Sequence, residues 1–300
     1  MTTPLSIGQC ATLACLLEVT APKVGNVHRG ADFEDLTFGD FAVSAVAIGP
    51  ALEAAGTTGV GAACLAAIRA TRRLVSTNTN LGIVLLLAPL AAVPRGRPLA
   101  DGVGEVLAAL SAQDSHDVYE AIRLAHPGGL GEVADMDVQA AAPPQLLDAM
   151  RAAADRDLVA RQYVEQYRHV FQLLVPWLVA DLSAGRSLID AIVHAQIQLL
   201  AAEGDSLIER KGGSRLARQV QELARAVLRA GEVGSDEYYQ ALGDLDFWLR
   251  ADGHRRNPGT TADLLAAALF VLLRDPPQPL GTWLVSPTGW RPLPESRAAE

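Results

Sequence analysis

The sequence has little of several features that would assign it to a common class. Its three cysteines, Cys10, Cys15 and Cys64, are an odd number at no metal-binding spacing, so we expect reduced core thiols, with no disulfide framework and no zinc site. The longest apolar run, from Leu81 to Val93, is shorter than the about 20 residues of a membrane span. The N-terminal segment lacks the basic region and apolar core of a signal peptide. We therefore expect a cytoplasmic protein without a membrane partner.

Positive charge is also scarce. The net charge is −9 and the pI about 5.2, whereas a protein that binds nucleic acid usually presents a basic face. We therefore expect no nucleic-acid partner. Only Lys23 and Lys211 are lysines among the 25 basic residues, and both lie in polar segments with nearby glycines. A small anionic ligand needs only a local group of cations, so it stays compatible with this composition.

Strand-like alternation is absent, and apolar residues recur at helical spacing almost throughout. The expected fold is all-α, a single globular domain of many helices over 1–275, with a ligand site formed by interhelix loops. A proline-rich C-terminal tail follows over 276–300. The pattern predicts helices over about 5–20, 37–55, 60–75, 80–92, 101–112, 115–126, 145–155, 156–182, 187–203, 214–230, 236–251 and 260–274. Pro176 should kink the helix over 156–182.

Three polar segments interrupt the apolar helices, and binding residues concentrate on such segments. The first covers 23–32 and carries two cations, an amide, an imidazole and a carboxylate, contributed by Lys23, Asn26, His28, Arg29 and Asp32. Cations and amides suit the oxygens of a triphosphate, and a carboxylate can hold Mg²⁺. The alternative is a solvated loop whose charges pair among themselves.

The second segment, 205–214, resembles a glycine-rich phosphate loop that runs into a helix N-terminus, although a Walker A motif is absent. It contains Asp205, Arg210 and Lys211, and an ordinary helix start is the alternative. The third segment, 254–265, has Arg256 and Asn257 before a Pro-Gly turn, with Asp263 in the first turn of the next helix. Helix capping is the alternative there. We expect the three segments to converge on one pocket.

Other polar residues have a functional and a structural interpretation each. Asn78 and Asn80 either cap the following helix or contact a nucleotide. Asp157 and Arg161 have the i, i+4 spacing of a solvated ion pair. Glu18 lies on an apolar helix beside the first segment, where burial should raise the pKa of its carboxyl and suit it to acid–base work.

Together these segments resemble one family. Residues 11–29 (ATLACLLEVTAPKVGNVHR), 78–83 (NTNLGI), 126–131 (HPGGLG), 205–213 (DSLIERKGG) and 257–265 (NPGTTADLL) are similar to the motifs of the triphosphoribosyl-dephospho-CoA synthases. The resemblance extends over about 5–275. It implies an all-helical transferase that moves the 5-triphosphoribosyl group of ATP to a hydroxyl acceptor, 3′-dephospho-CoA in the family, and releases adenine. ATP is then a substrate, and Mg²⁺ accompanies its triphosphate.

The segments and the resemblance together give a set of candidate site residues. We expect catalytic groups at Glu18, His28 and Asp32 and metal contacts at Asp205 and Asp263. Contacts to ATP are expected from Lys23, Asn26, Arg29, Asn78, Asn80, Arg210, Lys211, Arg256 and Asn257. The sequence does not fix the oligomeric state, and a homo-oligomer is compatible with it.

The sequence departs from the pattern of the lyase-linked members of the family. His28 stands where they have Asp, Leu207 where they have Asn, and Asn257-Pro-Gly-Thr-Thr where they have SPGGS. The cations and the final Asp of the motifs are retained. We therefore expect a divergent member whose donor is ATP. A different acceptor, in one-carbon cofactor biosynthesis of the tetrahydromethanopterin type, is one alternative, and a non-enzymatic helical interaction protein is the other.

Overall fold

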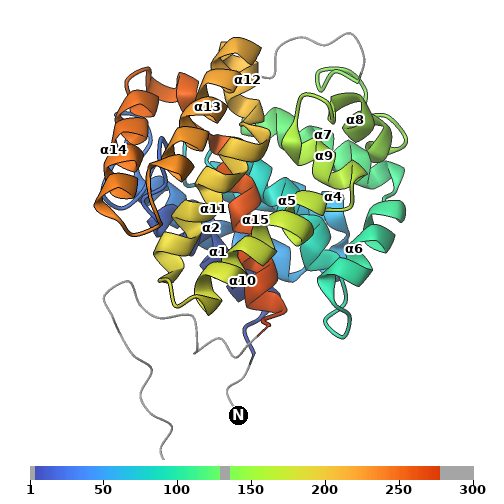
Figure 1. Cartoon of the computed structure of the whole chain (residues 1–300). Helices are drawn as coiled ribbons and strands as arrows, with labels where there is room; N and C mark the ends of the chain where they lie inside the picture. Colours follow the sequence, from blue (N-terminus) through green and yellow to red (C-terminus); the bar gives the residue numbers. More distant parts are fainter. Residues whose placement is uncertain (1–3, 129–135, 278–300) are drawn as a thin grey trace, which may run out of the picture.

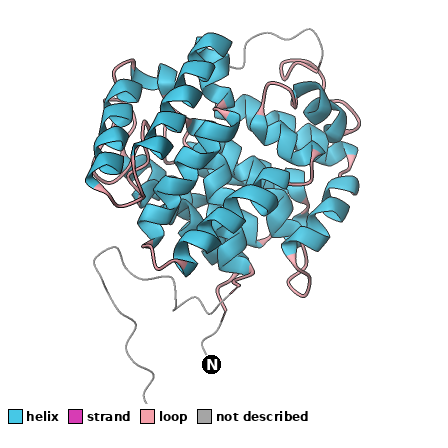
Figure 2. Cartoon of the chain, in the orientation of Figure 1, coloured by secondary structure: helices cyan, strands magenta, loops and turns pink. Residues whose placement is uncertain are grey.

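The computed structural model describes residues 4–128 and 136–277. These residues form fifteen α-helices, one π-helical segment and one 3₁₀ turn, and they contain no strand (Figure 2). The all-α prediction is confirmed. None of the helices in these two ranges is both long and apolar enough to cross a membrane. Almost all of the tail expected at 276–300 lies outside the described residues.

The helices fall close to the predicted ranges, with additional short elements. In chain order they are α1 Ile7–Thr20, α2 Phe38–Glu53, α3 Ala55–Thr58, α4 Val60–Arg72, α5 Leu81–Ala92, α6 Leu99–Ala108, α7 Ala112–Ala125, α8 Leu146–Ala153, α9 Leu158–Val164, η1 Val170–Leu174, α10 Val175–Ser183, α11 Leu188–Glu203, α12 Ser206–Gly212, α13 Ser214–Ala230, α14 Asp236–Arg250, η2 Gly253–Arg256 and α15 Gly259–Arg274.

Helix α15 runs through the centre of the bundle and packs against α1, α5 and α11 (Figure 1). Every residue from Leu264 to Arg274 is buried, as expected of a helix that is apolar on all sides. The chain therefore surrounds α15 from Leu264 onwards, whereas Asp263, which follows the first turn of the helix, is partly exposed.

The predicted helix over 156–182 is broken, and two tyrosines beside the break contact a hydrogen-bonding defect in α5. Pro89 has no N–H, so the carbonyl of Leu85 loses its helical partner. The hydroxyl of Tyr163 donates to that carbonyl at 2.6 Å, and the hydroxyl of Tyr167 donates to the next one, that of Leu86, at 2.7 Å. The chain turns at Gln166 and Tyr167, which have positive φ, before it continues into η1 and α10. The break therefore lies well before the kink expected at Pro176.

Side chains cap the starts of α2 and α12. At the start of α2, the side chain of Thr37 accepts from the N–H of Asp40, and the Asp40 carboxylate accepts from the N–H of Thr37. The expected phosphate loop over 205–214 is wrong. Its residues form the short helix α12, because the Asp205 side chain caps it through the N–H groups of Leu207 and Ile208.

We predict that Gly25→Ala destabilises the fold. Gly25 has φ of +70°, and a Cβ there would lie 2.9 Å from both Leu249 Cβ and Pro258 Cδ. The free energy of unfolding should fall by about 1–3 kcal/mol. Gly243→Ala, in α14 where a Cβ meets nothing within 4 Å, is the matched control and should raise it by about 0.5–1 kcal/mol. Urea denaturation measures both variants, and equal effects would contradict the packing described for Gly25.

Candidate functional site

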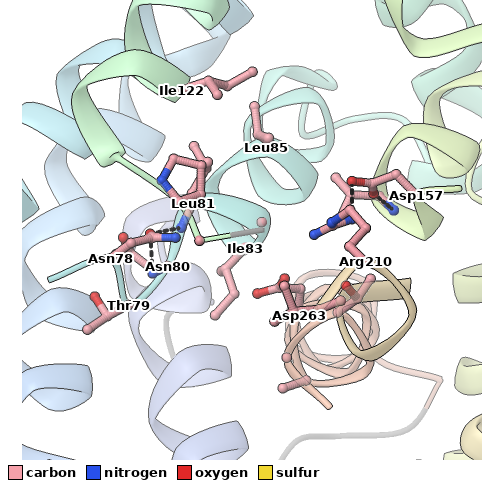
Figure 3. A pocket seen from close by; sticks show the side chains of 18 of the residues that line it. Asn78, Thr79, Asn80, Leu81, Ile83, Leu85, Ile122, Asp157, Arg210 and Asp263 are labelled. Atoms are coloured by element: carbon pink, nitrogen blue, oxygen red, sulfur yellow. Dashed lines mark hydrogen bonds and ion pairs between the residues drawn. The ribbon is translucent and has the colours of Figure 1, made fainter. Parts of the chain in front are cut away.

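A cavity of about 460 Å³ opens among α1, α5, α7, α8, α9, α12 and the start of α15. All three polar segments contribute to its wall, through Asn26 and Val27, through Leu207, Arg210 and Lys211, and through 257–263. The predicted convergence is thereby confirmed. In Figure 3, Asp263 lies between the Asn78–Asn80 segment and the Arg210–Asp157 pair.

One wall of the cavity contains a buried ion pair. Glu18 is near the end of α1 and is 3% exposed, and Lys23, which follows the turn at Pro22, is fully buried. The Lys23 Nζ lies 2.8 Å from Glu18 Oε1 and donates at 2.5 Å to the main-chain carbonyl of Glu18. Burial raises the pKa of the Glu18 carboxyl, and Lys23 opposes that rise. Lys23 therefore balances the negative charge of the Glu18 carboxylate. Glu18 lines the cavity, whereas Lys23 does not.

A second carboxyl, that of Asp263, faces the cavity beside Glu18. No hydrogen bond or ion pair joins it to any residue that the structure describes. Burial raises its pKa well above the ordinary value, and the charges of Glu18, Asp205 and Asp157 add to that rise, against a weaker effect of Arg210. The Asp263 carboxyl therefore tends to hold a proton.

Gly82, in the first turn of α5, makes room for Asp263. A Cβ at Gly82 would lie 2.0 Å from Asp263 Oδ2 and 2.5 Å from its Cγ, closer than any real contact. Gly82 belongs to the NTNLGI motif, and the sequence alone indicates no role for it. Only the packing of α15 against α5 reveals why a side chain cannot occupy this position.

The cations that line the cavity come from α12 and from the turn before α9. Arg210 Nη1 lies 2.6 Å from Asp157 Oδ2, and Lys211 Nζ donates to the main-chain carbonyl of His254 at 3.0 Å. Burial lowers the pKa of Lys211. Arg156 also lines the cavity and is exposed, and the one hydrogen bond of its side chain among the described residues goes to the Ala152 carbonyl at 3.4 Å.

Arg156 and Asp157 are site residues that sequence reasoning missed. The spacing of Asp157 and Arg161 predicted a solvated pair, but Arg161 binds the main-chain carbonyls of Ala154 and Asp155. Asp157 instead caps α9 with one oxygen and pairs with Arg210 through the other. No signal in the sequence indicates that contact, because it depends on the turn between α8 and α9.

The Asn78–Asn80 segment both caps α5 and lines the cavity, so its two interpretations are compatible. Asn78 Oδ1 accepts from the N–H of Leu81 at 3.1 Å. The Asn80 amide donates to Thr71 Oγ1 at 3.1 Å, and its own Oδ1 is buried with no hydrogen-bond partner in the described parts of the chain. The rest of this wall is apolar, with Ile83, Leu85 and Ile122.

Several predicted residues of the first segment lie outside this cavity. Of this segment only Asn26 and Val27 line the cavity with Asp263. His28 lines a separate cavity of about 290 Å³ beside Tyr238. Asp32 accepts from the N–H of Phe38 at 2.6 Å and so helps to begin α2. Arg29 is exposed.

Two residues of the other segments also lie outside it. The guanidinium of Arg256 stacks at 4.0 Å on the ring of Trp248 and donates to the Trp248 carbonyl. Asp205 is buried: one of its oxygens caps α12, and the other accepts from the N–H and hydroxyl of Thr261 at 2.7 and 2.8 Å. These contacts give Asp205 the role of joining α12 to α15.

We predict that Lys23→Met lowers the free energy of unfolding by about 3–5 kcal/mol, because it leaves the Glu18 charge buried without its partner. Lys23→Met combined with Glu18→Gln should recover part of that loss. Chemical denaturation of the two variants at pH 7 measures the difference. A Lys23→Met variant that keeps wild-type stability but binds ATP weakly would instead support the original expectation that Lys23 contacts phosphate.

Comparisons with known proteins show which family the chain belongs to. No curated protein matches the chain. A solved structure from Archaeoglobus fulgidus, named provisionally as a triphosphoribosyl-dephospho-CoA synthase, is similar at a TM-score of 0.60 and 26% identity, over 78% of this chain and 98% of the other. The sequence model of the CitG family, described as ATP:dephospho-CoA triphosphoribosyl transferase, matches residues 4–280. This chain therefore belongs to that family and is a transferase.

Proposed function

We propose that the protein transfers the triphosphoribosyl group of ATP to a hydroxyl of a second substrate and releases adenine. The observation that carries this proposal is the division of one cavity into three walls. Two carboxyls with raised pKa values, Glu18 and Asp263, lie on one wall, the cations Arg156, Arg210 and Lys211 on another, and apolar side chains on a third. Breaking a glycosidic bond in a nucleoside triphosphate needs these three environments together.

The cationic wall suits the triphosphate. Arg210 is held in place by Asp157, and Lys211 is held by the His254 carbonyl. Both side chains are therefore already fixed before a ligand binds. Arg156 has no carboxylate partner among the described residues and can turn towards a phosphate. Because the triphosphate is kept intact in this transfer, these contacts would hold the donor and orient its ribose, while the chemistry takes place at the carboxyls.

The carboxyl wall supplies the acid and the base. As the bond between C1 of the ribose and the adenine nitrogen breaks, its electron pair passes to adenine, and protonated Asp263 donates a proton to the base. The acceptor hydroxyl oxygen then bonds to C1 and loses its proton to Glu18. The Glu18 carboxylate also favours the positive charge that develops at C1, by analogy with glycoside hydrolysis. Two carboxyls in different environments take different roles.

The described residues do not suit a protein-held Mg²⁺ site, although Asp205 and Asp263 were expected to form one. They contain no group of three or more His, Cys, Asp or Glu side chains that could hold a metal. The Asp205 oxygens accept from α12 and Thr261, and Asp263 favours its protonated form. A magnesium ion that arrives with ATP would be held by phosphate oxygens and water, and it would offset phosphate charge there.

Dephospho-CoA is the acceptor named for the family, and one observation favours a different one here. Of the positions where the sequence departs from the family pattern, Leu207 and Asn257 line the cavity, and the site of a Cβ on Gly259 lies 2.7 Å from Leu207 Cδ2. An apolar Leu at this place changes the surface that a second substrate meets. A hydroxyl acceptor other than dephospho-CoA, as in one-carbon cofactor biosynthesis, is therefore the second candidate.

The reaction is tested by incubating the protein with ATP, Mg²⁺ and 3′-dephospho-CoA and following free adenine by chromatography. We expect adenine to appear in step with a triphosphoribosylated product. Adenine that appears only with another hydroxyl acceptor would support the second candidate. Release of ADP or AMP would contradict the proposal, because it would show cleavage within the triphosphate.

We predict that Asp263→Asn abolishes adenine release and makes the protein more stable at pH 8. The raised pKa of Asp263 means that its stabilising effect is present at low pH and is lost as the pH rises towards that pKa. A neutral amide avoids that loss, so the melting temperature should rise by about 2–4 °C at pH 8 and change little at pH 4. Wild-type activity in this variant would contradict the acid role.

We predict that Lys211→Ala weakens ATP binding about ten- to a hundredfold, because one charge-assisted contact is worth about 1.5–3 kcal/mol. Isothermal titration with ATP and Mg²⁺ measures the change. Arg218→Ala, on an exposed face of α13, removes the same charge elsewhere and is the control. Equal affinities in the two variants would remove Lys211 from the triphosphate site.

A further inference from the structure

Three amide side chains from distant parts of the sequence form a continuous row that ends at the cavity. Gln196, on α11, is fully buried and does not line the cavity. Its Nε2 donates to Asn26 Oδ1 at 2.9 Å, and Asn26 Nδ2 donates to Asn257 Oδ1 at 2.7 Å. Asn26 and Asn257 both line the cavity. Glutamine 196 carries no signal in the sequence, where it lies within an apolar helix.

The backbone fixes the direction of this row at its first member. The main-chain N–H of Val24 can only donate and its carbonyl can only accept. Gln196 Oε1 accepts from that N–H at 2.9 Å, and Gln196 Nε2 donates to that carbonyl at 2.9 Å. In the reverse orientation of the amide, its NH₂ group would face the Val24 N–H and its oxygen would face the Val24 carbonyl. The NH₂ group must therefore lie on the side of the Val24 carbonyl and of Asn26.

The second and third members then have no freedom of orientation. Asn26 meets the NH₂ group of Gln196 with its oxygen, so its own NH₂ group points to the third segment. A second backbone contact agrees, because Asn26 Nδ2 also donates to the Pro258 carbonyl at 3.3 Å. Asn257 must meet this NH₂ group with its oxygen. Its Nδ2 points away from Asn26 and has no hydrogen-bond partner among the described residues.

From this geometry we infer that Gln196 is a positioning residue that makes Asn257 a hydrogen-bond donor to the substrate in the cavity. The ligand atom at this place is then an acceptor, such as a phosphate oxygen or a ribose oxygen of the donor nucleotide. The inference rests on the proposed function for the identity of that nucleotide. It adds which amide atom faces the substrate, and a residue outside the cavity that determines it.

Asn257→Asp tests the direction of the row. A carboxylate still accepts from Asn26, so the loop is kept, but it offers the substrate a negative oxygen in place of an NH₂ group. At pH 8 we expect the Kd for ATP, measured by titration calorimetry, to rise at least about tenfold. Below about pH 4, the ordinary pKa of an aspartate, the carboxyl takes up a proton and can donate again, so the ratio of variant to wild-type Kd at the same pH should shrink.

Two further variants keep the test decisive if Asn257→Asp folds poorly. Asn257→Ala should raise the Kd about five- to tenfold, with a ratio to wild type that does not change with pH. Gln219→Glu adds the same charge on an exposed face of α13 and should bind ATP as the wild type does. Asn257→Asp or Asn257→Ala with wild-type affinity at pH 8 would overturn the inference.

A double-mutant cycle tests the part played by Gln196. If Gln196 acts through Asn257, the two changes should not add. The Kd for ATP of the double variant Gln196→Met with Asn257→Ala should then exceed that of the weaker-binding single variant by no more than about twofold. If instead the fold-changes in Kd of the two single variants multiply in the double variant, Gln196 supports only the loop, and the positioning role is overturned. Adenine release is measured separately. A wild type that binds ATP without releasing adenine contradicts the proposed function alone, and one that binds no ATP at millimolar concentration overturns both.

Discussion

The buried ion pair between Glu18 and Lys23 is the constraint on which the site depends. A fully buried ammonium must have a partner, and Lys23 takes both the Glu18 carboxylate and its main-chain carbonyl. These contacts fold the chain back at the end of α1, and Gly25 then fits against Leu249 and Pro258. The turn consequently brings the first polar segment against the start of α15. Two regions that are more than 200 residues apart meet there and form one wall of the cavity.

The acid–base properties follow from that meeting. Glu18 is balanced by Lys23, whereas Asp263 has no such partner in the described chain and is surrounded by other carboxyls, so the two groups differ in their tendency to hold a proton. Gly82 leaves the space that Asp263 occupies. Arg210 and Lys211, which are held by Asp157 and by the His254 carbonyl, line the same cavity from α12. The core helix α15 thus presents a partly exposed carboxyl where its close packing ends.

Much of the fold could be predicted because helical spacing and capping residues are local signals. The segments that form the cavity were also recognisable, as were Glu18, Asp263 and Lys211, since each lies in or beside a polar segment that interrupts the apolar helices. The direction in which each side chain points could not be predicted from the sequence. Lys23 and Asp205 are residue types that often contact ligands. In this protein Lys23 pairs with buried Glu18, and Asp205 accepts a hydrogen bond from buried Thr261. Arg156 was missed, because its place in the cavity depends on long-range packing.

The protonation state of Asp263 in the free protein tests the account most directly. Its side-chain carboxyl can be followed by ¹³C NMR during a pH titration, with Asp263→Asn used to assign the signal. The account predicts a midpoint well above the ordinary value of an aspartate, about 3.9, because burial and three neighbouring carboxyls oppose ionisation. Glu18 should also titrate above its ordinary value, since burial outweighs the effect of Lys23. A midpoint for Asp263 at or below about 4 would contradict the account, because Asp263 would then be ionised at neutral pH and could not protonate the departing base.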